Sequence, residues 1–554
     1  MKKKPRIIII GTGGAGLTAA IEAANYDVEI LLITKGQYRN QNYKWSSNGG
    51  CTWKTHGFNA AISTGDSIEE HVKDTLKGGA FANNKKLVET LCAGAVDLVD
   101  WLSTLGITLD KNGNEIDTRP FGGCGTPRSV FIEDRLGFYI QKALNERVES
   151  LIHAGKISIL EHVRAMELLK DSHNNITGLK ALDIHTLEYI EISCSAVIVA
   201  DGGGASMYSP TAVSCDKTCD GIMMALNAGA NIIDMEFVQF HPTGIATDIS
   251  VFDGSLVEEV LRFDGAHLLD KENNRFMFKY NSLGETATRD EVARGIYSEI
   301  VNGNGFDNHS VKLDISNCKE IIDIRYPALS ERLRQSGYDI QTTSHIYIRP
   351  TAHFLMGGIK INEKTETTIS GLYAAGESAG GVHGANRLGG NGLSEALVFG
   401  RIAGENAAKF SLNTSTTNPT INQIGSVKIK TIKHFYTPDT LLNKLRRSMY
   451  WHAGPIRNTK GLEKMLAILD EISAGFDQID LGTGSSASAQ VQQYFDLKNL
   501  VGASEMILRS ALLRDESRGS HYSQDNQAMK DTFTGIGYIY KNNKPEHFFY
   551  EHIN

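Results

Sequence analysis

The sequence predicts an α/β protein in which a parallel-sheet domain is interrupted by an α+β capping domain and followed by a mainly helical C-terminal domain. Three observations lead to this fold class. The strand-like segment 6–10, an arginine followed by four isoleucines, passes directly into a glycine-rich turn at 11–16 and then into a helical pattern. A second strand, glycine-rich turn and helix occupy residues 371–408. The segment 231–350 between these regions mixes loops, short strands and one clear helix, which marks it as an insertion.

The first glycine-rich turn contains Gly11, Gly13, Gly14 and Gly16 in the spacing G-x-G-x-x-G. Glycine lets the backbone approach a ligand closely, and the free amides at a helix start favour an anion. Strand, turn and helix in this order predict the dinucleotide-binding arrangement of a Rossmann-like domain. The start MKKKPRIIII is similar to a secretion signal, but no cleavage pattern precedes the glycines. We therefore expect a first strand and a cytoplasmic protein.

The second glycine-rich turn, GGVHGANRLGGNG, gathers positive charge. His353, His383 and Arg387 lie in or just before it, close to glycines and to the start of the helix LSEALVFGRIAGENAA. Cationic side chains, accessible backbone amides and a helix start in one place are suited to binding an anion.

The predicted domain organisation follows from these turns. Residues 1–230 and 351–410 form the discontinuous nucleotide-binding domain, and residues 231–350 form a mobile cap over the ligand crevice. The composition of the segment SLNTSTTNPT, 411–420, indicates a linker, and 421–554 form a C-terminal domain that is mainly helical.

Composition excludes several classes of function. The 554 residues contain 56 lysines and arginines against 64 aspartates and glutamates, a net charge of −8, with no long basic run. This argues against nucleic acid or an anionic membrane as the main partner. No stretch approaches the length of apolar sequence that spans a bilayer. The seven cysteines form no paired C-x-x-C sites, so we expect no metal, iron–sulfur cluster or haem in the chain.

Several segments together resemble the flavoproteins of fumarate reductase, succinate dehydrogenase and L-aspartate oxidase. The resemblance runs nearly from end to end. It is carried by GTGGAGLTAA (11–20), MEFVQFHPTG (235–244), TRDEVARGI (288–296), PTAHFLMGGI (350–359), GLYAAGESAGGVHGANRLGGNGLSEALVFGR (371–401) and LLRDESRGSHY (512–522).

The resemblance implies FAD as the cofactor, with its pyrophosphate at the first helix. Glu377 resembles the residue on the ribityl chain, and Asp220 matches a family carboxylate, although the first could cap a turn and the second a helix. Tyr43 stands where some members carry a flavin-linked histidine, so we expect noncovalent FAD. The implied cofactor-binding residues are Gly11, Gly13, Gly14, Gly16, Thr34, Lys35, Gly49, Gly50, Asp220, Gly376, Glu377, Asn391, Gly392 and Leu393.

The resemblance also implies the reaction, which moves a hydride between flavin N5 and a carbon next to a carboxylate. The substrate carboxylates would then be bound by Arg387, His353 and His241. Arg289 matches the residue that transfers the proton, and Glu259 and Arg262 match its relay. An arginine has a pKa above about 12, so it needs neighbours that assist proton transfer.

Some positions depart from the family pattern. Glu258 stands where the family usually has threonine beside a substrate carboxylate, and an anion there would repel that carboxylate by ~1–4 kcal/mol. Glu258 could instead meet an amino group or retain a proton. Phe263, Leu355, Gly392 and Asp201 also replace the usual residues. Phe121 matches the dicarboxylate enzymes, whereas L-aspartate oxidases have glutamate in its place.

We therefore expect an FAD-dependent oxidoreductase that interconverts a saturated and an α,β-unsaturated carboxylate. The alternative is an L-aspartate oxidase or a related amino-acid oxidase, and a third interpretation is a flavin-binding subunit without turnover. The expected partners are a small carboxylate substrate and, for electron transfer, a separate iron–sulfur protein, free flavin, quinone or oxygen.

Overall fold

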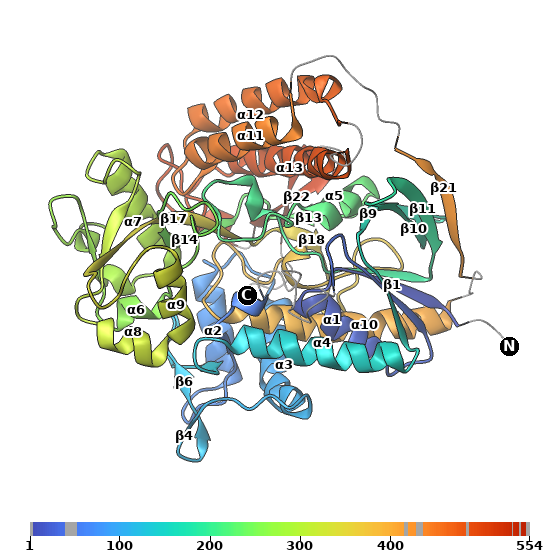
Figure 1. The fold of residues 1–554 in the computed structure, drawn as a ribbon, viewed down its shortest axis with the longest axis horizontal. Coiled ribbons are helices and arrows are strands. Elements are labelled where there is room, and N and C mark those ends of the chain that lie inside the picture. The colour runs from blue at the N-terminus through green and yellow to red at the C-terminus, as the bar shows by residue number, and fades with distance from the viewer. Residues whose placement is uncertain are drawn as a thin grey trace.

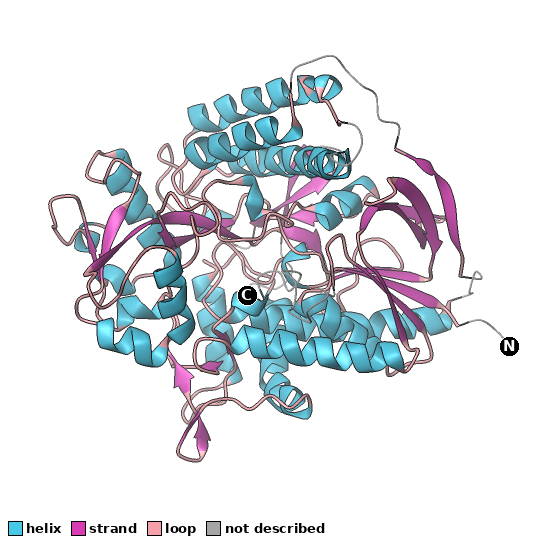
Figure 2. Ribbon diagram, in the orientation of Figure 1, coloured by secondary structure: helices cyan, strands magenta, loops and turns pink. Residues whose placement is uncertain are grey.

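The computed structural model describes residues 4–38, 52–414, 419–427, 436–482, 487–534, 536–541 and 544–549. Helices cover one face of a parallel sheet, a smaller α+β body lies at one side, and three long helices lie on the opposite side of the molecule from the helical layer (Figure 1; Figure 2). This is the α/β class expected from the sequence, with a Rossmann-like domain, a cap and a C-terminal helical region.

The central parallel sheet has the strand order β19-β12-β1-β2-β8. Its strands are β1 (Arg6–Ile10), β2 (Glu29–Ile33), β8 (Ile157–Leu160), β12 (Ala196–Val199) and β19 (Leu372–Ala374). All five residues of β1 are buried, because β2 and β12 flank it and helices cover its face. Strands from 6–10 and 372–374 share this sheet, so the two glycine-rich turns meet at one edge.

Four helices form the layer on one face of this sheet (Figure 1). They are α1 (Gly14–Ala23), α3 (Lys85–Thr104), α4 (Leu136–His153) and α10 (Asn391–Asn413). A Cβ at Gly404 would lie 2.2 Å from the carbonyl oxygen of Ala19, so only glycine lets α10 pack this closely on α1.

Two further sheets belong to the same body. The antiparallel sheet β21-β11-β10-β9 contains β9 (Val163–Lys170), β10 (Ile176–Asp183), β11 (Glu188–Ser193) and β21 (Ile421–Ser426). The sheet β20-β18-β13-β22-β23 contains β13 (Ile232–Ile233), β18 (Gly358–Lys360), β20 (Ala379–Gly380), β22 (Ile536–Lys541) and β23 (Lys544–Phe549). Strand β21 therefore pairs with β11 of the nucleotide-binding region, and β22 pairs with β13, although the sequence assigns residues 421–554 to a C-terminal domain.

The inserted segment has its own hydrophobic core, which runs from Ile245 to Ile348. Its sheet, β14-β17-β16-β15, comprises β14 (Val238–Ile245), β15 (His267–Leu269), β16 (Val311–Asp314) and β17 (His345–Leu355). Helices α6 (Val260–Phe263), α7 (Arg289–Val301), α8 (Lys319–Arg325) and α9 (Pro327–Gln335) pack around it. A separate core identifies this segment as a body distinct from the sheet domain.

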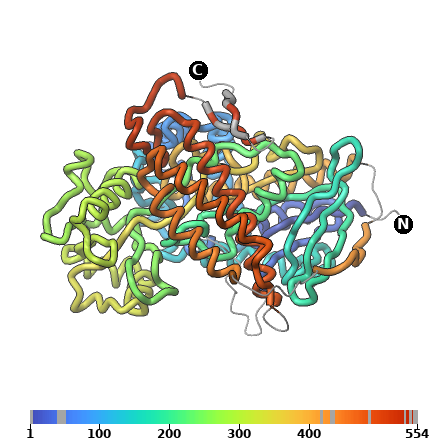
Figure 3. The backbone as a smooth tube through the Cα atoms, turned by 90° about the horizontal axis from the view of Figure 1, so that it is seen from above, coloured from blue at the N-terminus to red at the C-terminus, as the bar shows by residue number. Residues whose placement is uncertain are grey.

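Three long helices cross the molecule on its other side: α11 (Pro438–Ala453), α12 (Thr459–Ala474) and α13 (Ala487–Leu513) (Figure 3). Buried ion pairs anchor the segment after α13 to the main body. Arg514 contacts Glu236 and Glu516, and Arg518 contacts Glu516, all with fully buried side chains. No helix in the described part of the chain has the length and apolarity needed to cross a membrane.

Candidate active site

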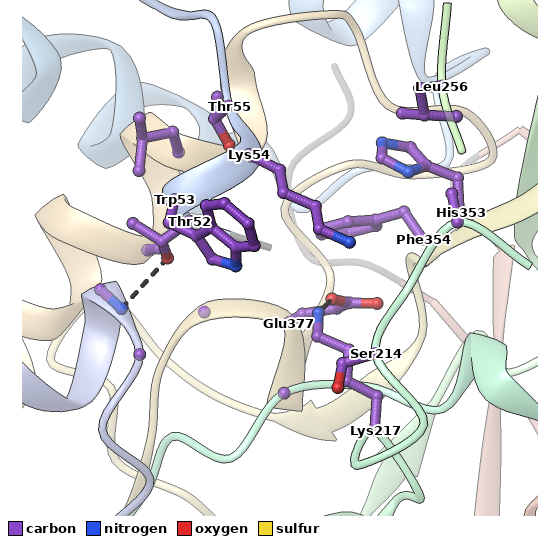
Figure 4. Close-up of a pocket in the computed structure, with 18 of the residues that line it drawn as sticks. Thr52, Trp53, Lys54, Thr55, Ser214, Lys217, Leu256, His353, Phe354 and Glu377 are labelled. Atoms are coloured by element: carbon purple, nitrogen blue, oxygen red, sulfur yellow. Dashed lines mark hydrogen bonds and ion pairs between the residues drawn. The ribbon is translucent and has the colours of Figure 1, made fainter. Parts of the chain in front are cut away.

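A cavity of about 720 Å³ extends from the first glycine-rich turn to the cap. Its walls come from the ends of β1 and β2, the helix starts of α1 and α10, the segment 52–57 and the cap residues 255–260. Figure 4 shows Lys54, His353 and Glu377 directed into this space from three different segments. The cavity has a nucleotide end, near α1, and an acid end, near Arg387.

The nucleotide end is shaped by the turn before α1. Gly11 has φ +105°, and a Cβ there would lie 2.4 Å from the Ala200 carbonyl oxygen. Gly11, Gly13 and Gly14 line the cavity, and no side chain caps α1 at Gly13. The start of α1 therefore presents backbone amides to a phosphate. Gly16 is not in the wall; it packs under the turn, where a Cβ would overlap the Gly11 carbonyl.

A buried ion network closes the nucleotide end. Lys35 Nζ donates to Asp220 Oδ2 at 2.8 Å, and Arg164 contacts the other carboxylate oxygen of Asp220. Arg164 also donates to Asp496 of α13 at 2.8 Å. Burial opposes ionisation of Asp220, but Arg164 and Lys35 outweigh it and hold the pKa of Asp220 below its ordinary value. Asp220 is the first residue of α5 (Asp220–Asn227), and Cys219 is the cap.

Other predicted cofactor residues lie in the same wall. Thr34, Gly376, Gly392 and Leu393 line the cavity. Glu377 lines it too; its Oε1 accepts from the backbone of Leu355 at 3.1 Å, and its Oε2 contacts Lys217.

Asn391 lies behind the wall. It is the first residue of α10, fully buried, and its side chain contacts Asn59, His71 and Thr75 at 2.8–3.0 Å. These contacts fix the start of α10, and Asn391 does not line the cavity. The nearby packing gives His71 a pKa of about 4, because burial disfavours the charged ring.

Gly49, Gly50 and Tyr43 lie outside the described residues. The neighbouring segment 52–57 does line the cavity, and Thr52 Oγ1 accepts from the backbone N–H of Gly14 at 3.1 Å (Figure 4). Trp53, Lys54 and His56 of this segment are wall residues that the sequence did not single out.

The acid end brings together the predicted catalytic residues. Arg289, the first residue of α7, donates through Nε to Glu259 Oε2 at 2.6 Å. Arg262 forms an ion pair of 3.3 Å with the other oxygen of Glu259. A capping box between Thr288 and Glu291 fixes the start of α7 and so the position of Arg289. Arg262 is buried behind Glu259, whereas Arg289 and Glu259 line the cavity.

Gln239 joins Arg289 and Arg387 of the cavity wall. Its side-chain oxygen accepts from Arg387 at 3.0 Å and from Arg289 at 3.3 Å. Its amide nitrogen donates to Asn386 and to the Arg387 carbonyl. Gln239 precedes His241 by two residues in β14, so both side chains lie on one face of the strand. That alternation in MEFVQFHPTG is a signal from which Gln239 could have been predicted.

Positive charge at the acid end exceeds negative charge. Burial and the neighbouring Arg289 lower the pKa of Arg387 to about 9, and its guanidinium lies 4.4 Å from the centre of the Phe354 ring. Burial, with nearby arginines, lowers the pKa values of His241 and His353 well below the usual range. The two imidazoles, 5.5 Å apart between ring centres, are therefore neutral. Arg262 and Arg289 share the carboxylate of Glu259, and Arg387 has no ion pair among the described residues, so an anion is favoured here.

Two predicted residues have different surroundings from those expected. His383 does not line the cavity; its Nε2 lies 3.0 Å from Glu395 Oε2, and both side chains are buried. Glu258 lines the cavity but is not an isolated anion. It pairs with Arg332 at 2.8 Å and with His56 at 2.7 Å. Burial opposes its ionisation, but these two partners lower its pKa, so Glu258 is ionised.

Phe121 and Asp201, two further positions compared with the family pattern, both lie in the cavity wall. Phe121 lines the cavity, and a Cβ at Gly389 would lie 3.0 Å from its ring. Asp201 also lines it and accepts from the backbone of Gly221 at 2.6 Å. Burial and Asp220 raise the pKa of Asp201 to about 6.

Fold and cavity together define an FAD-binding oxidoreductase, and comparisons with known proteins agree. The family model "FAD binding domain" matches residues 6–393, and "Fumarate reductase flavoprotein C-term" matches residues 442–553. The chain belongs to the family of fumarate reductase, succinate dehydrogenase and L-aspartate oxidase flavoproteins, and its cofactor is FAD.

Individual relatives cover almost the whole chain. A fumarate reductase (CoM/CoB) subunit of Methanothermobacter marburgensis is 35% identical over 94% of each chain. L-aspartate oxidase of Synechocystis is 31% identical, also over 94% of each chain. The structure of a mutant quinol fumarate reductase FrdA of E. coli superposes with a TM-score of 0.87 at 26% identity, covering 98% of this chain and 96% of FrdA.

Proposed function

We propose that this protein interconverts a saturated and an α,β-unsaturated carboxylate, as a fumarate reductase does. The single observation that carries this proposal is the unbalanced positive charge at the acid end. Arg262 and Arg289 share the single carboxylate of Glu259, whereas Arg387 has no ion pair among the described residues and donates to Gln239. His241 and His353 are neutral and line the same cavity, which is continuous with the FAD site. Such a site gains most from a carboxylate ligand.

The chain's residues divide into two roles. Arg387, oriented by Gln239 and Phe354, would bind one substrate carboxylate with two parallel hydrogen bonds, assisted by His353 and His241. Arg289 would transfer the proton at the neighbouring carbon, since it lines the cavity and is held at a fixed position by Glu259 and Gln239. Glu259 and the buried Arg262 would return the proton to Arg289.

FAD, when bound, supplies the hydride donor or acceptor for this reaction. Its phosphates would lie at the start of α1, and Glu377 and Asp220 would complete its site. We propose that the attachment is noncovalent, as Tyr43 suggests. Acid precipitation should then release all the flavin into the supernatant, and a fluorescent polypeptide on a denaturing gel would contradict this.

L-aspartate oxidase activity is the second candidate, because relatives of that name cover 94% of the chain. Two features favour the first candidate. Phe121 presents an apolar ring where the oxidases have glutamate. Glu258, the other candidate for an amine contact, already accepts from Arg332 and His56.

Two assays separate the candidates. The FAD-loaded enzyme should oxidise a reduced dye with fumarate and should not consume oxygen with L-aspartate. Oxygen consumption with aspartate and no fumarate reduction would reverse the order. Electrons would come from a separate donor, such as an iron–sulfur protein, because we expect no metal relay in the chain. Within the described residues no cluster of metal ligands occurs.

A further inference from the structure

A second group of charged residues lines the cavity beside the acid end. Glu258 lies between Arg332 of α9 and His56 of the segment 52–57, at 2.8 Å and 2.7 Å. Arg332 is also fixed by the Leu256 carbonyl, to which it donates at 3.0 Å. This group directly adjoins the catalytic one, because Glu259, the next residue, holds Arg289, and neighbouring Cα atoms are about 3.8 Å apart.

The three members of this group differ in exposure. The side chain of Glu258 is 6% exposed, whereas Arg332 is 22% exposed and His56 is 26% exposed. The carboxylate is therefore covered by its two partners, and the side chains that reach the cavity are those of Arg332 and His56. Within the described residues, Nδ1 of His56 is buried and has no hydrogen-bond partner. A guanidinium carries five N–H groups, and Arg332 uses its two terminal nitrogens for Leu256 and Glu258, with donors remaining.

We propose that Arg332 and His56 bind the second acid group of the substrate, and that Glu258 is the buried counter-ion that orients them. The inference rests on the proposed function and makes it more specific: the substrate is a dicarboxylate, with one acid group at Arg387 and the other at Arg332. Where the family usually has a threonine hydroxyl at position 258, this chain has Glu258, which holds the cationic side chain of Arg332 in place. This resolves the apparent conflict between an extra anion and an anionic substrate.

The test compares a dicarboxylate with a monocarboxylate that lacks the second acid group. Malonate and propionate, in which a methyl group replaces one carboxylate, would be titrated into the FAD-loaded full-length protein by calorimetry. The wild-type protein should bind malonate about tenfold or more tightly than propionate, since a charged hydrogen bond is lost with the second carboxylate. Arg332→Gln should reduce this ratio to about one, and His56→Gln should reduce it by about two- to fivefold.

A matched control and a double variant separate binding from packing. Arg334→Gln alters an exposed arginine of the same helix, paired with Glu331 at 2.9 Å, and should leave the ratio unchanged. Arg332→Gln alone also leaves Glu258 without one of its two partners, which would disturb the cap. Glu258→Gln combined with Arg332→Gln removes that unpaired charge. If Arg332 binds the substrate, the double variant keeps the low ratio.

The outcomes distinguish this inference from the proposed function. A ratio that persists in Arg332→Gln, or recovers in the double variant, overturns the inference alone, provided that the wild-type enzyme reduces fumarate. Equal wild-type binding of malonate and propionate also overturns it. A wild-type protein with full FAD content that binds neither malonate nor fumarate would overturn the proposed function as well.

Discussion

The two ends of the cavity hold charge in opposite ways. At the nucleotide end, the cations Lys35 and Arg164 are matched by Asp220 and Asp496, and Lys217 is matched by Glu377. At the acid end, Arg262 and Arg289 share the one carboxylate of Glu259, and Arg387 has no ion pair among the described residues. The side-chain charges at the nucleotide end are therefore paired within the chain, and the groups left to bind the phosphates are the backbone amides at the start of α1. The acid end is balanced only when an anionic ligand is present.

The largest test of this contrast is Arg289→Gln. Removing the proposed proton donor should lower the turnover number by about 10²–10⁴-fold. FAD content should be unchanged, because Arg289 lies at the acid end. Steady-state kinetics and the flavin-to-protein absorbance ratio measure the two quantities. Arg325→Gln on the cap surface, 60% exposed, is the control and should keep full activity. Retained turnover in Arg289→Gln would remove Arg289 from the mechanism.

Asp220→Asn tests the nucleotide end. It leaves Arg164 and Lys35 buried without their main partner, and breaking a buried pair costs about 3–5 kcal/mol. Thermal unfolding should show the loss, together with reduced FAD content. Asp496→Asn is the milder comparison, since Asp496 is 20% exposed, and it should cost about 1 kcal/mol. Equal effects of the two substitutions would contradict the view that Asp220 is the centre of this network.

The pH dependence of the free energy of unfolding should reveal that the imidazoles of His241 and His353 stay uncharged in the folded protein. An unfolded histidine takes up a proton near pH 6.5, whereas folded His241 and His353 do not, because burial and nearby arginines lower their pKa values. Their contribution to stability is full above about pH 6.5 and falls below it by up to about 1.4 kcal/mol per pH unit for each residue.

Thermal unfolding between pH 7.5 and 5.5 measures this slope. His353→Gln should reduce the slope of stability against pH by the contribution of one histidine. His173→Gln, in an exposed turn, should leave the slope unchanged. Malonate should also flatten it, because a bound anion favours the protonated rings. A wild-type slope that His353→Gln leaves intact would show that this imidazole is not the one that titrates.

Local patterns predicted much of the fold. The one clear helix expected within residues 231–350 is α7, and the expected strand at 6–10 is the buried strand β1. Both depend on short-range information, namely a capping residue and a glycine-rich turn. The pairing of β21 with β11 was not predicted, because hydrogen bonds between residues 188–192 and 421–426 leave no signal in either segment.

The candidate site was predicted where residues carry a motif and missed where partners are distant in sequence. For Glu258 the sequence left open repulsion of a carboxylate, contact with an amino group or a retained proton. The pairing with Arg332 was missed because Arg332 is 74 residues away and carries no motif. His383 was placed among the anion-binding groups because of its neighbours in the turn, yet it faces Glu395 of α10. Burial and long-range pairing decided both cases, and neither can be read from the local sequence.

The two consecutive glutamates at 258 and 259 have a mechanical consequence. One holds the cations proposed for the distant acid group, and the other holds the proton-transferring arginine, yet a single peptide bond joins them. Any hinge motion that moves this dipeptide away from the flavin would weaken substrate binding and displace the proton donor at the same time. Substrate binding and proton transfer would then be switched on and off together.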